Sequence, residues 1–339
     1  GNYAYVADGD SGLAIIDVTD KANPGTPVYE DTTFANNVAV VGNYAYVPNL
    51  ASGLAIIDIT DKSNPGTPVY VDTGGANDVT VVGNYAYVAE AGSSPGLAII
   101  DISDKANPGT PVYEDTSNWA VGVTVVGNYA YVVTMESGLA IIDISDPTNP
   151  GTPVYEDTTG TAYDVTVVGN YAYVADGDSG LAIIDISNKA NPGTPVYKDL
   201  SKSASGVTVV GNYAYVADFE SGLAIIDITD KSNLGTPVYV DTQWYARDVT
   251  VVGNYAYVAD SSSGLAIIPL NMSSLTYTIA SLPTSGKLKD GGTEIIAAGD
   301  ISGALTYLPN ANFTGNDTFK FTAKDDESTP AVSNQATVT

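Results

Sequence analysis

The hexapeptide Gly-Asn-Tyr-Ala-Tyr-Val occurs seven times in the chain, and its spacing constrains the fold more than any other feature. Successive copies start 41, 41, 44, 42, 42 and 42 residues apart. The copies begin at Gly1, Gly42, Gly83, Gly127, Gly169, Gly211 and Gly253. A period of about 42 residues built from short β-strands is typical of a β-propeller, in which each repeat forms one blade.

Each repeat predicts four antiparallel strands. In the copy at residues 76–116, we expect strands over 78–82, 85–88, 96–102 and 111–116. Gly83 and Asn84 form a favoured two-residue hairpin turn between the first two strands. Pro111 marks a strand start or an outer edge, because proline cannot donate a ladder hydrogen bond. Both faces of the third strand are apolar, as expected for a blade packed between two neighbours. The sequence therefore predicts an all-β chain with a seven-bladed propeller.

The strand count predicts an irregular closure of this propeller. Seven second and third strands are evident, but only six first and six fourth strands. The N-terminal blade thus lacks its innermost strand and the C-terminal blade its outermost. Residues before Gly1, residues 275–279 or another chain could supply these strands, since we read the chain as a segment of a longer protein. Unpaired edges accept added strands, so self-association through the incomplete blades is also predicted.

The repeat resembles a known family. Its pattern, seen in Leu97-Ala98-Ile99-Ile100-Asp101 and the preceding Gly-Asn-Tyr-Ala-Tyr-Val, resembles the LVIVD repeat family of bacterial and archaeal propellers over residues 1–270. The resemblance implies a propeller and a frequent location on exported surface proteins. It implies no defined reaction and no catalytic residues. The last copy departs from the pattern, because Pro269 stands where the others have aspartate.

Residues 271–339 lack the repeat and predict a second domain. Candidate strands lie at 275–280, 286–289, 293–296, 304–309, 317–325 and 334–339. Their alternation and spacing predict a small β-sandwich whose first strand is not evident. This segment resembles the cadherin-like, Ig-like tandem domains of bacterial surface adhesins, which implies a stalk module.

The charge and composition exclude several function classes. The chain holds 12 Lys and Arg against 39 Asp and Glu, with a net charge of −27. Such a chain repels nucleic acid and anionic membranes, because no basic patch offsets the repulsion. It contains no cysteine and no histidine, which excludes disulfides, Ser-His-Asp triads and the usual zinc sites. The sequence contains no apolar run of 18 or more residues, so membrane insertion of this segment is not predicted.

The variable loops predict a binding face. The loops between second and third strands and those between blades belong on one side of a propeller whose innermost strand comes first. Within residues 1–270, these loops carry all the aromatic residues outside the repeated strands. Aromatic rings beside carboxylates favour a glycan or protein ligand, whereas the alternative is that the rings plug the channel or cap the blades. The candidate binding residues are Phe34, Trp119, Tyr163, Phe219, Trp244, Tyr245 and Arg247.

Two turns resemble half of a calcium loop. Asp8 and Asp10 in one turn, and Asp176 and Asp178 in another, place carboxylates one residue apart. Calcium takes six to eight oxygen ligands, and neither turn has the downstream acidic ligand of an EF-hand. The two interpretations are a polar β-turn and a weak calcium site of the extracellular type.

Catalysis is not expected. The loop carboxylates Asp8, Asp176, Asp218, Glu220 and Asp260 recur because the repeat recurs, and Arg247 alone cannot form a sialidase arginine cluster. We therefore predict an extracellular or cell-surface prokaryotic module for adhesion or recognition. The alternative is a structural subunit of a fibre or surface layer assembled by strand complementation. A carboxylate-dependent hydrolase is the third hypothesis.

Overall fold

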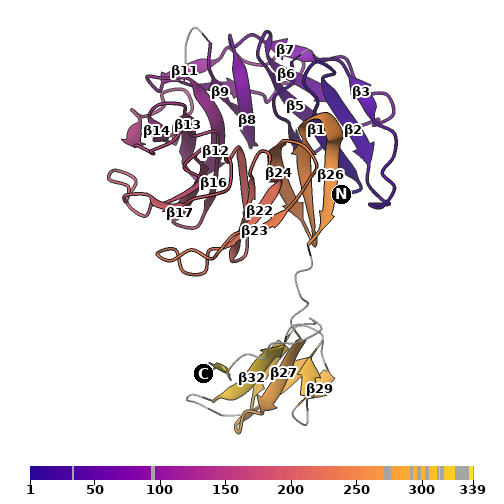
Figure 1. Cartoon of the computed structure of the whole chain (residues 1–339), viewed down its shortest axis with the longest axis vertical. Helices are drawn as coiled ribbons and strands as arrows, with labels where there is room; N and C mark the ends of the chain where they lie inside the picture. The colour runs from indigo at the N-terminus through magenta and orange to yellow at the C-terminus, as the bar shows by residue number, and fades with distance from the viewer. Residues whose placement is uncertain are drawn as a thin grey trace. The chain divides into compact units, whose positions relative to one another are not determined.

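The computed structural model describes residues 1–32, 34–92, 96–270, 276–290, 293–295, 299–301, 305–310, 313, 317–324 and 336–338. The chain divides into two compact units, Gly1–Pro269 and Leu270–Thr339. In the first unit, seven antiparallel sheets surround a central axis, as Figure 1 shows. This arrangement confirms the predicted seven-bladed propeller.

The blades follow one another in chain order. The first contains β1 (Tyr3–Ala7), β2 (Leu13–Asp17) and β3 (Val28–Glu30), and the second β4 (Ala39–Val41), β5 (Tyr44–Asn49), β6 (Gly53–Asp58) and β7 (Val69–Val71). The third contains β8 (Ala76–Val82), β9 (Tyr85–Glu90), β10 (Gly96–Asp101) and β11 (Val112–Asp115), and the fourth β12 (Ala120–Val126), β13 (Tyr129–Thr134), β14 (Gly138–Asp143) and β15 (Val154–Glu156).

The remaining blades repeat this order. The fifth contains β16 (Asp164–Val168), β17 (Tyr171–Ala175), β18 (Leu181–Asp185) and β19 (Val196–Lys198), and the sixth β20 (Gly206–Val210), β21 (Tyr213–Ala217), β22 (Leu223–Asp227) and β23 (Val238–Val240). The seventh contains β24 (Ala246–Val252), β25 (Tyr255–Asp260), the 3-10 turn η1 (Ser261–Ser263) and β26 (Gly264–Pro269). Among the described residues, no helix is long enough to cross a bilayer.

The hairpin between the first two strands of a blade forms as expected. Gly83 adopts a φ of 59° as the first residue of the turn, a value that glycine reaches without strain. The turn sets the register that pairs Val82 with Tyr85 and Val79 with Val88. The same register recurs in the other four-stranded blades, so equivalent side chains face equivalent neighbours around the ring.

The core of the propeller lies between blades rather than within them. Ala86 and Ala98 of the third blade pack against Tyr46, Leu54 and Ile56 of the second, and all five are buried. Burial of a leucine or isoleucine side chain contributes about 1.5–3 kcal/mol. The small alanines allow the large side chains of the neighbouring blade to approach closely.

A lysine clip links neighbouring blades on the opposite side from the variable loops. Lys105 of the third blade donates to the carbonyl of Ile102 at 3.3 Å, and its ammonium lies 5.3 Å from the ring of Tyr44 in the second blade. Such a contact contributes about 0.5–1 kcal/mol at an exposed site. The clip recurs as Lys21–Tyr255, Lys62–Tyr3, Lys189–Tyr129 and Lys231–Tyr171.

The predicted strand deficits are confirmed. The first blade is a sheet of β1, β2 and β3, and the seventh a sheet of β24, β25 and β26. Among the described residues, no strand pairs with the inner edge of β1 or the outer edge of β26. The suggestion that residues 275–279 supply a strand is wrong, because β27 (Thr276–Ser281) pairs with two strands of the second unit. Leu275 itself lies outside the described residues.

The second unit contains two small sheets. One has the order β30 (Gly299–Ile301), β27, β32 (Phe319–Lys324), β33 (Ala336–Val338), and the other β29 (Thr293–Ile295), β28 (Gly286–Asp290), β31 (Leu305–Pro309). Ile279, Leu288 and Phe319 are buried together. The sequence analysis missed β30, a strand of only three residues. The predicted sandwich and its cadherin-like character stay predictions.

Two glycines with nearly equal backbone angles test the open edge of β26. Gly222 has a φ of 74°, and a Cβ there would lie 2.4 Å from the Val240 carbonyl oxygen on the fourth strand. Gly264 has a φ of 78° and no atom within 4 Å of such a Cβ. We expect Gly264→Ala to lower the free energy of unfolding by about 1–3 kcal/mol through backbone strain alone. Gly222→Ala should cost about 2 kcal/mol more in urea unfolding, because the fourth strand must also move. Equal losses of unfolding free energy in the two variants would contradict the open edge of β26.

Candidate functional site

The two sets of variable loops lie together on one side of the propeller, which we call the loop face. Isolated bridges join the loop after a second strand to the following blade-to-blade loop, as in Gly177 with Ala204 and Phe219 with Ala246. Each bridge holds the two loops at hydrogen-bonding distance. Side chains from different blades can therefore meet on this face.

Four of the predicted binding residues form one aromatic cluster. The rings of Phe219 and Tyr245 stack with centroids 4.4 Å apart and an interplanar angle of 10°. Trp244 meets Tyr245 edge-on at 6.3 Å, and the Arg247 guanidinium lies 4.8 Å from the Phe219 ring. Phe219 comes from the sixth blade, and the other three come from the loop and strand that lead into the seventh. The side chain of Trp244 is half exposed.

Phe219 occupies a strained backbone position. Its φ is 43°, in the left-handed region that favours glycine. At the matching turn position two other repeats carry glycine, Gly9 with φ 48° and Gly177 with φ 53°. A non-glycine residue there costs on the order of 1–2 kcal/mol. The repeat fold therefore does not require this phenylalanine, and a strained residue of this kind points to a role beyond folding.

An open hollow of about 500 Å³ lies beside Phe219. Lys202 and Glu220 on its rim form an ion pair at 3.0 Å, and both side chains are about half exposed. The hollow thus combines an aromatic wall with charged and hydroxyl groups. Its lining is Asp178, Leu200, Ser201, Lys202, Ser203, Phe219 and Glu220.

The other three predicted binding residues lie apart from the cluster. Phe34, Trp119 and Tyr163 are exposed on the loops that enter the second, fourth and fifth blades. None of the three makes a ring contact with another aromatic residue in the described part of the chain. Tyr163 packs beside Gly177, where an added Cβ would lie 3.3 Å from its ring. The structure therefore brings together four of the seven candidate residues.

The proposed calcium turns differ from each other. The Asp176 carboxylate is buried and accepts hydrogen bonds from Thr158 Oγ1 at 2.6 Å and from the Gly160 N–H at 2.9 Å. Asp178, Asp8 and Asp10 are exposed. No group of three or more acidic side chains within the described ranges is placed to hold a metal ion. The calcium assignment stays a prediction.

Buried acids at the ends of the second strands connect neighbouring blades, a role that the sequence analysis missed. Asp260 accepts a hydrogen bond from Thr242 Oγ1 at 2.9 Å, and Glu90 from the Gly75 N–H at 2.8 Å. Each donor belongs to the segment that arrives from the preceding blade. Burial raises the pKa of Asp218 to about 6 and that of Glu90 to about 7. In three repeats, those of Glu90, Asp176 and Asp260, the acid follows an Asp-Thr at the end of the preceding fourth strand, and this pairing was the available signal.

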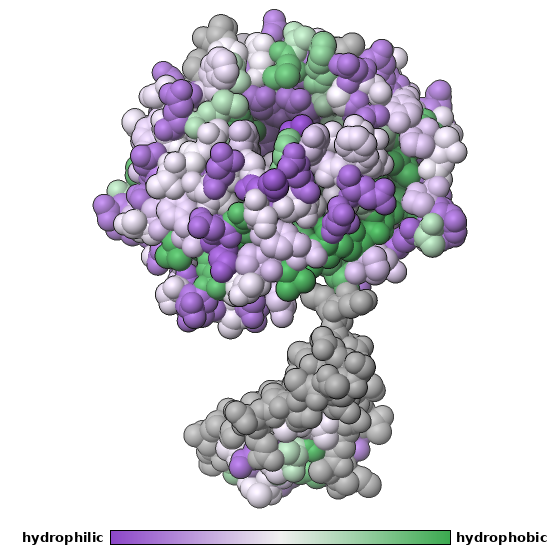
Figure 2. All heavy atoms as spheres, in the orientation of Figure 1, coloured by the Kyte–Doolittle hydropathy of each residue, from purple (hydrophilic) through white to green (hydrophobic). Residues whose placement is uncertain are grey.

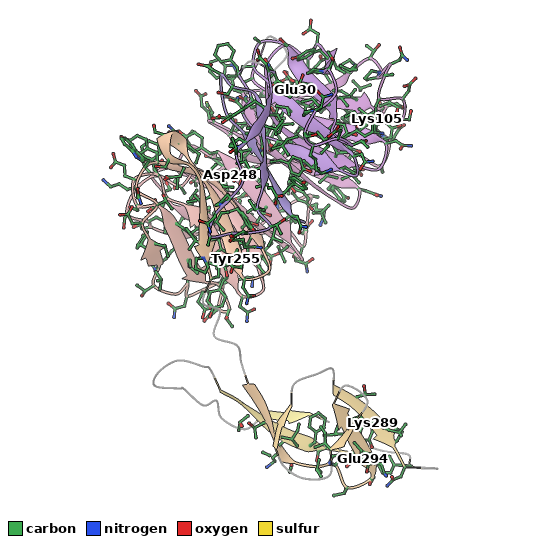
Figure 3. All side chains as sticks on the ribbon, turned by 90° about the vertical axis from the view of Figure 1, so that its right-hand side faces the viewer. Glu30, Lys105, Asp248, Tyr255, Lys289 and Glu294 are labelled. Carbon is green, nitrogen blue, oxygen red and sulfur yellow. The ribbon has the colours of Figure 1, made fainter. Side chains whose placement is uncertain are left out.

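A second set of acids lines the central channel. Asp78 is buried and accepts hydrogen bonds from its own neighbour Val79 and from the Val123 N–H of the next blade, both at 2.7 Å. Asp164 bonds the Val207 N–H of the following blade in the same way. Asp248, which lies on the innermost strand of the seventh blade (Figure 3), accepts from Val249 at 2.7 Å.

The channel acids stand in every second blade from the third to the seventh, and the blades between them carry glycine at the same position. Gly122 and Gly206 stand at the equivalent position in the blades between them, and a Cβ on Gly206 would lie 2.7 Å from an Asp248 oxygen. Burial, followed by the charges of Asp248 and Asp78, raises the pKa of Asp164. Burial is also the main cause that raises the pKa of Asp78 to about 6. Burial among the channel strands also raises the pKa of Asp248, although part of this residue remains exposed.

The family is settled by the repeat model that matches the chain. The LVIVD repeat model matches residues 1–28, 34–73, 73–111, 119–153, 159–194, 201–242 and 244–277. The chain belongs to the LVIVD repeat family. No curated protein matches this LVIVD-repeat chain in sequence.

Solved structures share the fold of this LVIVD-repeat propeller at low sequence identity. The β-propeller domain of Swd1 from Myceliophteria thermophila is 12% identical with a TM-score of 0.61, over 80% of this chain and 94% of that one. BamB from Moraxella catarrhalis is 16% identical with a TM-score of 0.53, over 80% of each chain. The computationally designed Ika8 protein is 8% identical with a TM-score of 0.57, over 79% of this chain and 93% of that one. These similarities show the fold alone.

The buried acids predict that the LVIVD-repeat propeller is most stable in mild acid. The native pKa values of Asp78, Asp218 and Glu90 exceed their unfolded values, so the folded state binds more protons between about pH 4 and pH 7. The free energy of unfolding should therefore fall as the pH rises through this window. Asp78→Asn should reduce that fall by about 2–3 kcal/mol, given 1.36 kcal/mol per pKa unit. Urea unfolding of the parent chain and of Asp78→Asn between about pH 4.5 and pH 8 measures the fall and its reduction.

Asp101 provides the control for this pH dependence. Its carboxylate is exposed, and hydrogen bonds from Ser103 lower its pKa. Asp101→Asn should therefore leave the slope between about pH 5 and pH 7 unchanged and alter stability only in stronger acid. A free energy of unfolding that rises from pH 5 to pH 7 in the parent chain would contradict the assignment of the buried acids.

Calcium titration tests the two aspartate turns. We expect any rise in melting temperature to require calcium at about 0.1–1 mM or above, because each turn offers few ligands. Asp10→Asn together with Asp178→Asn should abolish that rise, since both carboxylates are exposed and available. The absence of any shift at about 10 mM calcium would remove the prediction.

Proposed function

We propose that this LVIVD-repeat propeller is a recognition module that binds a glycan or protein partner through its loop face. The observation that carries the proposal is the cluster of Phe219, Trp244, Tyr245 and Arg247 beside an open hollow. Aromatic and arginine side chains dominate the binding energy of many protein interfaces. Aromatic walls with a few convergent polar groups are equally typical of small-ligand sites, including those for sugars.

The cluster is separate from what the propeller needs to fold. Phe219 stands at a position where Gly9 and Gly177 serve the same turn with less strain. Arg247 is the only arginine of the chain, and it lies in this cluster. The rings are supplied by loops held on a rigid scaffold, an arrangement that limits the entropy lost on binding. These features favour a ligand contact over a structural plug.

The hollow suggests the chemistry of the ligand. Lys202, Glu220 and Asp178 offer both charge signs, and two serines offer hydroxyl groups. Such groups can bond the hydroxyls of a sugar or the polar side chains of a protein loop. The net charge of −27 would favour partners with a basic surface through long-range attraction.

The proposal extends to location and chemistry. We place the protein outside the cell or on the cell surface of a prokaryote, as an adhesion module without enzyme activity. Asp176 and Asp218, which a hydrolase on this face would use, are buried and accept hydrogen bonds from the preceding blade-to-blade loop. Groups engaged in this way are poor candidates for a general acid or base, because such groups must reach the substrate.

The second candidate function is assembly by strand complementation. The open edges of β1 and β26 favour it, since unpaired edges are templates for β-augmentation. In that case the protein would be a subunit of a fibre or surface layer.

Binding arrays test the recognition proposal. The full chain would be screened on glycan and protein arrays, and the affinity of each positive ligand measured by calorimetry. Trp244→Ala and Arg247→Ala should each weaken binding by about tenfold or more, because they remove the exposed parts of the cluster. Trp119→Ala, at a separate loop, reports whether the second tryptophan contributes.

The control removes an exposed aromatic residue outside the loop face. Tyr155 lies on the outer strand β15 and is 38% exposed. Tyr155→Ala should leave the affinity unchanged while removing similar apolar surface. Binding that persists in Trp244→Ala and Arg247→Ala would place the ligand elsewhere and refute the proposed site.

A further inference from the structure

The only arginine of this LVIVD-repeat chain has no acidic partner among the described residues. Arg247 is exposed, and its guanidinium lies 4.8 Å from the centre of the Phe219 ring. In the described part of the propeller, the one ion pair joins Lys202 to Glu220. The chain holds 39 acidic and 12 basic residues, so acidic partners are plentiful. An arginine left unpaired in such a chain is available to a ligand.

Positive charge on the loop face is confined to the surroundings of Phe219. Lys202 lines the hollow beside this ring, and Arg247 contacts the ring itself. Glu220 compensates the charge of Lys202 at a distance of 3.0 Å, whereas no ion pair within the described ranges compensates that of Arg247. The other basic residues of the propeller lie on the outer strand β19 or in the clips on the opposite side: Lys198, and Lys21, Lys62, Lys105, Lys189 and Lys231.

The chemistry of the Arg247 side chain specifies the group that it would bind. A guanidinium is planar and carries five N–H donors, which match the two oxygens of a carboxylate through paired hydrogen bonds. Contact with Phe219 restricts the long side chain before a ligand arrives, so that less conformational entropy is lost on binding. The site therefore offers one partly ordered partner for a planar oxyanion.

The hollow beside Phe219 offers hydrogen-bonding groups of a different kind. Asp178 and Glu220 present carboxylates that accept hydrogen bonds, and Ser201 and Ser203 present hydroxyls that both donate and accept. A second carboxylate on the ligand would be repelled by Asp178 and Glu220, whereas hydroxyl groups would donate to them. The ligand that fits both parts of the site has one carboxylate and several hydroxyl groups.

The net charge of −27 limits how many carboxylates the ligand carries. Figure 2 shows hydrophilic residues over much of the propeller face that it draws, and acidic residues predominate among the charged residues of the chain. A polymer with a negative charge on every unit would meet long-range repulsion from such a surface. Arg247 acts only at contact, so it favours a ligand in which a single acidic unit lies among neutral ones.

A uronic-acid residue within a glycan has this combination of groups. Its ring carries one carboxylate and several hydroxyls, and its C–H groups form an apolar face that stacks on aromatic rings such as the half-exposed Trp244. We propose that the loop-face site binds an acidic glycan, with the carboxylate of one uronic-acid residue on Arg247 and its hydroxyls in the hollow lined by Asp178 and Glu220. This ligand assignment rests on the proposed recognition function, which it narrows to one class of glycan.

Acidic peptides and phosphates match the site less well than a uronic acid. An aspartate or glutamate side chain supplies the carboxylate but brings no hydroxyl groups for Asp178 and Glu220. A phosphate monoester carries more negative charge than a carboxylate at neutral pH, so the acidic surface repels it more strongly. Lys202 does not offset the additional charge, because Glu220 already pairs with it.

Methyl glycosides of glucuronic and galacturonic acid test the assignment on the full chain, with the methyl glycosides of glucose and galactose as matched neutral probes. We expect at least one uronide to bind saturably with a dissociation constant of about 1–10 mM, measured by NMR titration. The matching neutral glycoside, which lacks the carboxylate, should bind at least about tenfold more weakly.

Two substitutions of the arginine locate the carboxylate of the ligand. Arg247→Lys keeps the charge but loses the planar fork, so it should weaken uronide binding by about threefold to tenfold. Arg247→Gln should remove the preference for the uronide over the neutral glycoside. The matched control is Lys105→Gln, which removes one positive charge beside an aromatic ring on the opposite side and should leave the affinity unchanged. Urea unfolding would verify that the variants are folded.

Four other outcomes overturn the assignment. No uronide binding at about 50 mM, equal binding of uronide and neutral glycoside, or a preference for the uronide that persists in Arg247→Gln refutes it. Tighter binding of N-acetylglutamate methylamide would assign the site to an acidic peptide instead, and tighter binding of glucose 6-phosphate would assign it to a phosphorylated ligand. An array ligand that requires Trp244 but contains no uronic acid would leave the recognition proposal intact while refuting the uronic-acid assignment.

Discussion

Packing between neighbouring blades is the interaction on which the rest of the propeller depends. Each sheet is apolar on both faces, so no blade can be stable without a partner on each side. Ala98 and Ile100 of one blade are buried by Tyr46 and Leu54 of the preceding one. The same contact repeated around an axis produces a ring, and the ring positions every loop. Between the seventh and first blades this packing persists through Ile16, but with more exposed neighbours.

Polar groups add direction to this apolar packing. Lys105 clips its blade to the preceding one on one side of the ring, and Asp260 binds the incoming segment on the other. Each link joins a blade to its immediate neighbour, so together the links fix how far one blade is shifted along the next. The cost is a set of buried carboxylates. Burial raises the pKa of Asp78 to about 6, because removal from water disfavours its charged form.

The frame could be predicted from sequence because it is repeated. The candidate residues could be predicted too, but not which of them come together in the structure. Strand order, the Gly83 hairpin and both incomplete blades followed from seven aligned copies, in which local turn chemistry and strand pattern agree. The stacking of Phe219 on Tyr245 depends on two loops that are remote in sequence meeting across a blade boundary. Trp119 carries an equally strong sequence signal, yet it stands apart, because a loop's composition does not specify which way its side chain points.

The repetition also explains where specific function can reside. A residue shared by all blades, such as the alanine at Ala86, has a counterpart in each copy and cannot by itself define a single site. Only departures from the repeat produce a unique surface. Phe219 is a departure in sequence, since it adopts a left-handed backbone conformation at a position where two other repeats carry glycine. Gly264 marks a departure in pairing, since it keeps a left-handed conformation although no described fourth strand pairs with β26. Phe219 packs against the loop that enters the seventh blade, and Gly264 lies within that blade, so both departures fall in one part of the ring.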